Sequence, residues 1–427
     1  MTLMEINWES ENILKINRQI PELEKIEPDK LRLMVEPWLS AIFQSEHLSL
    51  LIGSGFTESI VNMVGTNAQN MGRIEFTTYK EQIKNRANTV AKESDRGEAN
   101  FEDDIRAASE LLNGLMILGN KEESDSLKKE LDIKLNDFIN GILLPEKLFM
   151  NSESDKQKPA LNYLKSFLIS FASRTATRDR LNVFTTNYDR FIEYGCDKAG
   201  IITLDRFIGK IEPIFRTTKL ELDYHYNPPG IRGEPRYVEG VVRYTKLHGS
   251  IDWRFKGRDI VKTSLPFGVE SSKASIPKDA SDHVVIYPNS SKGSETSYYP
   301  YSELFRDFSA GICRPNSALI TFGYGFGDSH INRILEDMLT ILSTHIVIIS
   351  YDDAHGRIQN FIKRNNPAQF TLLLGNHLGD LKNLVEFYLP KAAIDRITER
   401  KHKLLERRGS EEEEDDDNSV IIEDKDA

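Results

Sequence analysis

Short apolar runs alternate with segments of helical periodicity in the last third of the chain. The apolar runs have the length of strands, and in the segments between them apolar residues recur every three or four positions. The runs cover residues 318–322, 346–350 and 370–374, and the helical segments cover 331–342, 358–363 and 381–389. Such alternation favours a parallel sheet with helices on both faces. The pattern predicts an α/β fold with a doubly wound, mostly parallel, Rossmann-like sheet.

The first part of the chain shows the same pattern with a long interruption. An amphipathic segment at 31–42 leads into an apolar run at 48–52, and the next strand pattern comes only at 181–185. The stretch 59–180 between them is polar and helical, and it is far longer than one crossover helix. We therefore expect one sheet-based domain over residues 1–400 with a helical insertion at 59–180.

Turn-forming residues dominate two further stretches. Gly, Pro, Asn and Ser are frequent between residues 206 and 244 and again between 255 and 297, mixed with short β-type runs. We expect short β hairpins near the strand ends there.

Composition restricts the class of protein. The chain has 427 residues and two cysteines, Cys196 and Cys313. Two thiols cannot form a four-cysteine zinc ribbon or a disulfide framework, so we expect a reducing compartment and no metal. Residues 1–8 lack the features of a signal peptide, and no apolar run is long enough to cross a bilayer. We expect a cytoplasmic protein that does not bind membranes.

The net charge of −11 is concentrated at the C-terminus. From Ser410 onward ten acidic residues stand against Lys425, so this part contributes −9 and the rest of the chain −2. A nearly neutral body creates no field that would favour nucleic acid. We expect residues 401–427 to be a disordered acidic tail, and the basic stretch 396–408 to be a solvated face.

Glycines and polar side chains follow the predicted strands. Gly53, Ser54 and Gly55 follow the run 48–52, where glycines and a helix start suit a pyrophosphate. Glu58 occupies the position of the third glycine of the dinucleotide fingerprint, so a plain tight turn remains the alternative.

Asn187 follows the run 181–185 within the segment FTTNYD. Its amide can donate and accept hydrogen bonds at once, to a sugar hydroxyl or a water. The alternative is an Asx turn that caps the next helix.

His248 and Asp328 end two further strand patterns. His248 follows the alternating run 241–247, and a histidine with an unperturbed pKa of about 6.5 can accept a proton at neutral pH. A structural role is the alternative for His248. Asp328 either binds a ribose or caps the helix that contains Ile331.

Four of these segments, in their order along the chain, resemble those of a known group of domains. GSGF, FTTNYD, KLHGSIDW and GYGFGDSHIN look like segments of the sirtuin-like NAD-binding domains of bacterial immune effectors, and they run from Leu48 to about Tyr388. Residues 287–293 and 299–305 resemble a further segment of that group.

This resemblance implies roles for individual residues. It implies that Asn187 and Asp189 face the nicotinamide ribose of NAD, the substrate, and that His248 is the catalytic histidine. The residues that would bind the rest of NAD are Gly53, Ser54, Gly55, Phe56, Thr186, Gly323, Tyr324, Gly325 and Asp328.

Departures from the classical sirtuins narrow the implied reaction. Ser54 and Thr186 stand where classical sirtuins have alanine and glutamine, and the zinc-binding cysteine module is missing. The missing module argues against a protein deacylase or ADP-ribosyl transferase. We expect an NAD hydrolase that acts as an abortive-infection, anti-phage effector, with a non-catalytic nucleotide-binding subunit as the alternative.

The resemblance also implies partners. Stand-alone proteins of this type resemble the partners of HerA-type hexameric ATPases. We therefore expect a homo-oligomer that assembles with an ATPase of that type.

Overall fold

The computed structural model describes residues 6–17, 19–21, 28–67, 73–93, 99, 101–174, 178–217, 223–226, 236–269, 283–285 and 299–391. The chain divides into two units, Met1–Pro390 and Lys391–Ala427, and the fold described below belongs to the first. Several expected features lie wholly or partly outside the described residues: residues 218–222, 227–235, 270–282 and 286–297 of the turn-rich stretches, the segment 287–293, the basic stretch 396–408 and the acidic tail 401–427.

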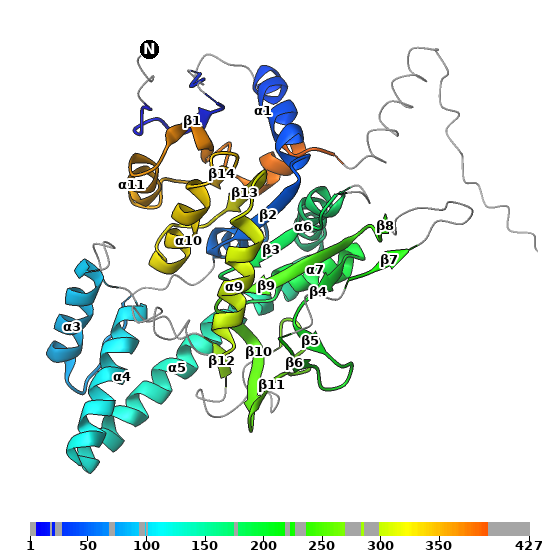
Figure 1. The fold of residues 1–427 in the computed structure, drawn as a ribbon. Coiled ribbons are helices and arrows are strands. Elements are labelled where there is room, and N and C mark those ends of the chain that lie inside the picture. Colours follow the sequence, from blue (N-terminus) through cyan, green and yellow to red (C-terminus); the bar gives the residue numbers. More distant parts are fainter. Residues whose placement is uncertain are drawn as a thin grey trace, which may run out of the picture. The chain divides into compact units, whose positions relative to one another are not determined.

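An eight-stranded sheet forms the centre of the first unit (Figure 1). Its strands are, in spatial order, β1 (Asn12–Lys15), β15 (Phe370–Gly375), β14 (His345–Ser350), β13 (Ser317–Phe322), β2 (His47–Ile52), β3 (Asn182–Thr185), β9 (Val241–Lys246) and β4 (Ile202–Leu204). Neighbouring strands are parallel, except that β1 runs antiparallel to β15. The predicted α/β class with a mostly parallel sheet is confirmed, and the six predicted strands of this sheet agree with the observed ones to within one residue at each end.

Helices cover both faces of this sheet. Successive residues of β2 show why: Leu50 and Ile52 pack in the core on one face, and Leu51 packs in the core on the other. One face is covered by α1 (Pro28–Phe43), α2 (Ser54–Met63), α6 (Ser154–Ala172), α7 (Phe191–Ala199), α12 (Leu381–Asn383) and the π-helical turn η5 (Leu384–Tyr388). The other is covered by α9 (Tyr301–Ile312), α10 (Ser329–Leu339) and α11 (Arg357–Lys363), and a 3₁₀ turn, η4 (Pro367–Gln369), precedes β15.

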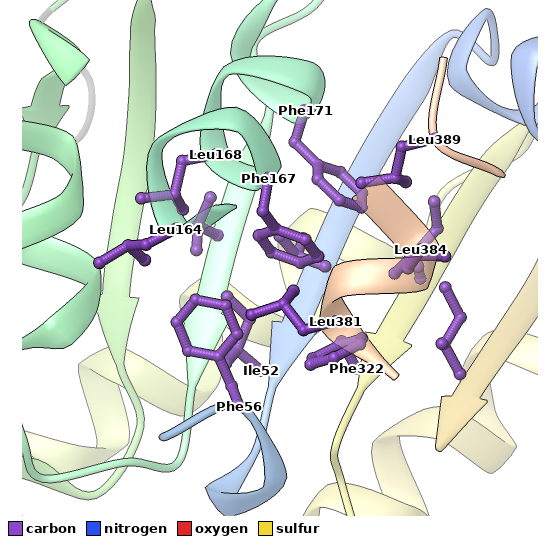
Figure 2. Packing of buried hydrophobic residues seen from close by; sticks show 14 of the residues in the cluster. Ile52, Phe56, Leu164, Phe167, Leu168, Phe171, Phe322, Leu381, Leu384 and Leu389 are labelled. Carbon is purple, nitrogen blue, oxygen red and sulfur yellow. The ribbon is translucent and has the colours of Figure 1, made fainter. Parts of the chain in front are cut away.

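Aromatic side chains fill the first of these cores. Figure 2 shows Phe167 of α6 between Phe56 of α2 and Phe322 of β13. The ring centroids of Phe56 and Phe322 lie 5.2 and 5.3 Å from that of Phe167. Ring pairs at such distances stabilise a core beyond the burial of their area. The packing fixes α2, which carries the first glycine turn, on the sheet.

Three helices between β2 and β3 have a core of their own. The helices α3 (Lys80–Glu93), α4 (Phe101–Leu118) and α5 (Lys121–Met150) pack side by side (Figure 1). Their shared core also includes Tyr188 and Ile251, which belong to the region beside the sheet. Within the stretch 59–180, α6 differs from these helices because it packs on the main sheet.

Short antiparallel strands follow β9. A five-stranded sheet has the order β12 (His283–Val285), β10 (Gly249–Lys256), β11 (Asp259–Lys262), β6 (Ile214–Phe215) and β5 (Phe207–Ile208), and β7 (His225–Tyr226) pairs with β8 (Arg236–Tyr237). The antiparallel pairs β5–β6 and β7–β8 fall within the stretch 206–244, where short hairpins were expected. The turn at Leu247 and His248 links β9 of the large sheet to β10 of the small one. No helix in the described part of the chain combines the length and apolarity needed to cross a membrane.

Glycines join the two central strands at their carboxyl ends. The Gly53 N–H donates to the Phe322 carbonyl at 3.0 Å, and the Gly55 N–H donates to the Gly323 carbonyl at 3.1 Å. A Cβ atom on Gly53 would lie 2.4 Å from the Gly323 oxygen, and Gly323 has a φ of +61°. The loops after β2 and β13 can touch only because these positions lack side chains.

We predict that Gly53→Ala lowers the free energy of unfolding by about 1–3 kcal/mol, because the added methyl group forces the two backbones apart. The matched control is Gly114→Ala in α4, where an added Cβ meets nothing within 4 Å. That change should stabilise the protein by about 0.5–1 kcal/mol, because alanine favours a helix interior more than glycine does. Urea denaturation measures both, and equal stability of the two variants would contradict the prediction.

Candidate active site

The carboxyl ends of the central strands form the edge at which the candidate site lies. From β2 the chain proceeds to β3 and β9 on one side of the sheet, whereas β13, β14 and β15 follow on the other. In open α/β sheets, ligands bind at the carboxyl ends where the strand order reverses in this way. Here the reversal lies between β2 and β13, the two strands joined by their glycine loops.

Asn187 lies in the loop after β3 and is held against the first glycine turn. Its Nδ2 donates to the Gly53 carbonyl at 3.0 Å and to Thr57 Oγ1 at 3.1 Å. Its backbone N–H donates to Thr185 Oγ1 at 3.0 Å, and the residue is only 7% exposed. Because both amide hydrogens are used, the side-chain oxygen is the atom that can accept from a ribose hydroxyl or a water.

Asp189 stabilises the Asn187 loop through two hydrogen bonds of its carboxylate. Its Oδ2 accepts from the Thr57 hydroxyl at 2.6 Å, and its Oδ1 accepts from the Phe191 N–H at the start of α7 at 3.2 Å. Burial raises the pKa of Asp189, while the positive charge of Lys246 and the Thr57 hydrogen bond oppose that rise. Asp189, rather than Asn187, therefore forms the turn that leads into α7, and its hydrogen bonds fit a positioning role.

Thr57 connects Asn187 to Asp189, and the sequence analysis missed it. Its hydroxyl accepts from the amide of Asn187 and donates to the carboxylate of Asp189. The one signal in the sequence is its spacing, because a residue four positions after Gly53 lies one turn into α2 and faces back to the glycine. Spacing alone does not reveal a partner 130 positions further along the chain.

His248 is buried beside Asp328. Its Nε2 lies 2.9 Å from Asp328 Oδ2, and the two residues are 5% and 8% exposed. Asp328 Oδ1 accepts from the His330 N–H at 3.0 Å, so Asp328 caps α10, which begins at Ser329. The ring centroid of His248 lies 6.0 Å from that of Tyr188. The structure thus places Asp328 against His248 and at a helix start.

The residues expected to bind the rest of NAD divide into two groups. The side chains of Phe56 and Tyr324 lie in the core, and the Tyr324 hydroxyl donates to Asn332 at 2.9 Å, so these two could meet NAD only through the backbone. Ser54 is exposed at the start of α2, and Thr186 is partly buried while its N–H donates to the Ile52 carbonyl at 3.1 Å.

A loop that no sequence motif marks, residues 351–356, borders the second glycine segment. It follows β14, and Ala354 and His355 in it have φ values of +49° and +58°. Arg357, just after this loop, donates from Nε to the Gly325 carbonyl at 2.7 Å. Left-handed backbone in residues other than glycine is costly and often occurs at functional sites. No motif marked this loop, which is recognisable only by its place after a central strand.

The helix α5 contacts the Asn187 loop directly. Glu146 of α5 is fully buried, and its Oε1 accepts from the backbone N–H of Arg190 at 2.9 Å. Glu146 also forms a buried ion pair with the Arg190 guanidinium. The ring centroid of Phe138 lies 5.6 Å from that of Tyr188. The position of α5 therefore determines where the residues that flank Asn187 lie.

The comparison with protein families agrees with this geometry. Residues 181–367 match the SIR2-like domain family. The matched span contains Asn187, His248 and Asp328, and it supports a sirtuin-like domain with an NAD-related activity. A search of curated proteins finds no match. Among the described residues no three His, Cys, Asp or Glu side chains are grouped so that they could hold a metal ion.

We predict that Thr57→Val lowers the free energy of unfolding by about 1–3 kcal/mol, because the buried groups of Asn187 and Asp189 each lose a hydrogen-bond partner. Valine matches threonine in shape, so the change tests the hydroxyl. The control is Thr57→Ser, which keeps the hydroxyl and should remain closer to the wild type. Chemical denaturation decides the matter: a valine variant as stable as the serine variant would show that the hydroxyl contributes little.

Proposed function

We propose that the protein hydrolyses NAD at the bond between nicotinamide and ribose. The observation that carries this proposal is that Asn187 and His248 follow the neighbouring strands β3 and β9 at the carboxyl edge of the sheet, within the span that matches SIR2-like domains. Tyr188, the neighbour of Asn187, packs near the imidazole of His248. An amide oxygen and an imidazole at one edge supply the two polar groups that the reaction needs.

The reaction requires few protein groups. Nicotinamide is a pyridinium in NAD, so it leaves as a neutral molecule when the C1′–N bond breaks and its nitrogen takes the electron pair. No general acid is needed. The protein stabilises an oxocarbenium-like centre at C1′ and positions water on the open face of the sugar. In this proposal Asn187 Oδ1 orients a ribose hydroxyl or the water, and His248 takes the proton.

We predict that Asn187→Ala and His248→Ala each lower nicotinamide release by about 10²-fold or more, because general base catalysis and orientation of the nucleophile contribute on that scale. Release is followed chromatographically after addition of NAD, in the presence of a chelator, since the proposal uses no metal. Turnover at the wild-type rate by both variants would refute the assignment.

The controls must account for burial, because the side chains of Asn187 and His248 are enclosed rather than exposed at strand ends. Thermal unfolding of each variant shows whether it still folds. His225→Ala replaces an exposed histidine of β7 and should leave the rate unchanged. A wild-type protein that binds NAD without releasing nicotinamide would instead indicate a nucleotide-binding subunit. Release that depends on an acylated peptide would indicate a deacylase.

We further propose that this hydrolysis serves anti-phage defence by depleting NAD, and that assembly controls it. The support is the resemblance to sirtuin-like immune effectors and to the partners of HerA-type ATPases. Uncontrolled hydrolysis would remove a central cofactor from the host, so the isolated chain should be slow and an assembled form fast.

We expect light scattering after size-exclusion chromatography to detect a homo-oligomer at micromolar concentration, and turnover per chain to rise in that form. A strict monomer that hydrolyses NAD at full rate would contradict control by assembly. Pull-down from the native host tests the ATPase separately, and recovery of the chain without any ATPase would count against that partner.

A further inference from the structure

The two carboxylate oxygens of Asp328 serve different partners. Oδ1 accepts from the backbone N–H of His330 and so caps α10, whereas Oδ2 lies 2.9 Å from Nε2 of His248. Eighty positions of sequence separate Asp328 from His248, and the two side chains are 7% and 6% exposed. One carboxylate thus joins a helix start to the proposed catalytic histidine.

The hydrogen bond between Asp328 and His248 determines the tautomer and the orientation of the imidazole ring. An ionised carboxylate can only accept hydrogen bonds, so Nε2 must carry the proton that it shares with Asp328. A neutral His248 then exists as the tautomer protonated at Nε2, and its ring plane is constrained by the same bond. When His248 takes up a further proton, the adjacent negative charge stabilises the imidazolium, and it does so strongly in a water-poor surrounding.

The Asp328 carboxylate lies at the start of α10. The carboxylate accepts from the His330 N–H and lies at the positive end of the α10 dipole, both of which stabilise its negative charge. The Asp328 backbone is also held, because its carbonyl accepts from the Asn332 N–H at 2.9 Å. The negative charge is therefore placed beside His248 by the start of a helix that packs on the central sheet.

We propose that Asp328 is the positioning residue of His248, which it holds in the productive tautomer and whose charged form it stabilises during NAD hydrolysis. This inference rests on the proposed function. It differs from the role that the sequence resemblance implied, in which Asp328 is one of the residues that bind the rest of NAD. The arrangement matches the general logic by which a buried carboxylate orients a catalytic histidine.

The variant Asp328→Asn separates the two roles of the side chain, which are the capping of α10 and the contact with His248. The asparagine oxygen can still cap α10, since Asn and Asp cap helices about equally well, but the charge beside His248 is lost. We expect kcat for nicotinamide release to fall by about 10²–10⁴-fold, with KM changed by no more than a few-fold and with nearly unchanged thermal stability.

The matched control is Asp380→Asn. Asp380 caps α12 by accepting from the Asn383 N–H at 2.9 Å, so the same change at this position tests a helix cap that has no catalytic histidine beside it. Its kcat should remain at the wild-type value. If Asp328→Asn releases nicotinamide as fast as Asp380→Asn, the inference is overturned. If its KM for NAD rises while kcat is unchanged, Asp328 contacts the substrate instead.

A spectroscopic measurement keeps the inference testable without turnover. Nitrogen-15 labelling of the histidines, with His248→Gln to assign the signal, reports which ring nitrogen carries the proton. We expect the wild-type His248 to be protonated at Nε2 and this preference to be lost in Asp328→Asn. A neutral wild-type ring protonated at Nδ1 would refute the pairing. Absence of nicotinamide release by the wild type in every form would instead count against the proposed function.

Discussion

The close contact between the glycine loops after β2 and β13 is the constraint on which the rest of the structure depends. Gly53 and Gly55 hydrogen-bond to the backbone of Phe322 and Gly323 at the point where the strand order reverses. The contact fixes the position of Gly53 and of α2, which carries Thr57. Asn187 in the loop after β3 then donates to the Gly53 carbonyl. A side chain at the contact would separate the two halves of the sheet at the edge where the candidate site lies.

Buried ion pairs also stabilise the loops at the carboxyl edge of the sheet. Glu146 and Arg190 join α5 to the Asn187 loop, and Lys246 of β9 lies within reach of Glu193 at 3.0 Å. Removing one partner of such a pair leaves an uncompensated buried charge, which costs several kcal/mol. The loop is therefore held only when α5, α7 and β9 are all in place, so the position of α5 and the geometry of the candidate site depend on each other.

Much of the fold could be predicted because its signals are local. Strands buried on both faces appear as continuous apolar runs, and the run at 345–350 shows this as clearly as any. The length of the helical stretch before β3 was equally visible. The division of that stretch was not, because α3 and α6 have similar periodicity, and whether a helix packs on the sheet or on other helices depends on surfaces remote in sequence.

The sequence by itself determined the order of strands and helices, the glycine turns and the chemical groups that follow the strands. It indicated Asn187 and His248, because a polar residue after an apolar strand is a local pattern. Only the tertiary structure decided that Asp328 lies against His248, that Thr57 orients Asn187 and that the side chain of Phe56 belongs to the core. The physical reason is that a hydrogen bond between distant residues leaves no periodic trace in the chain, whereas burial of apolar area does.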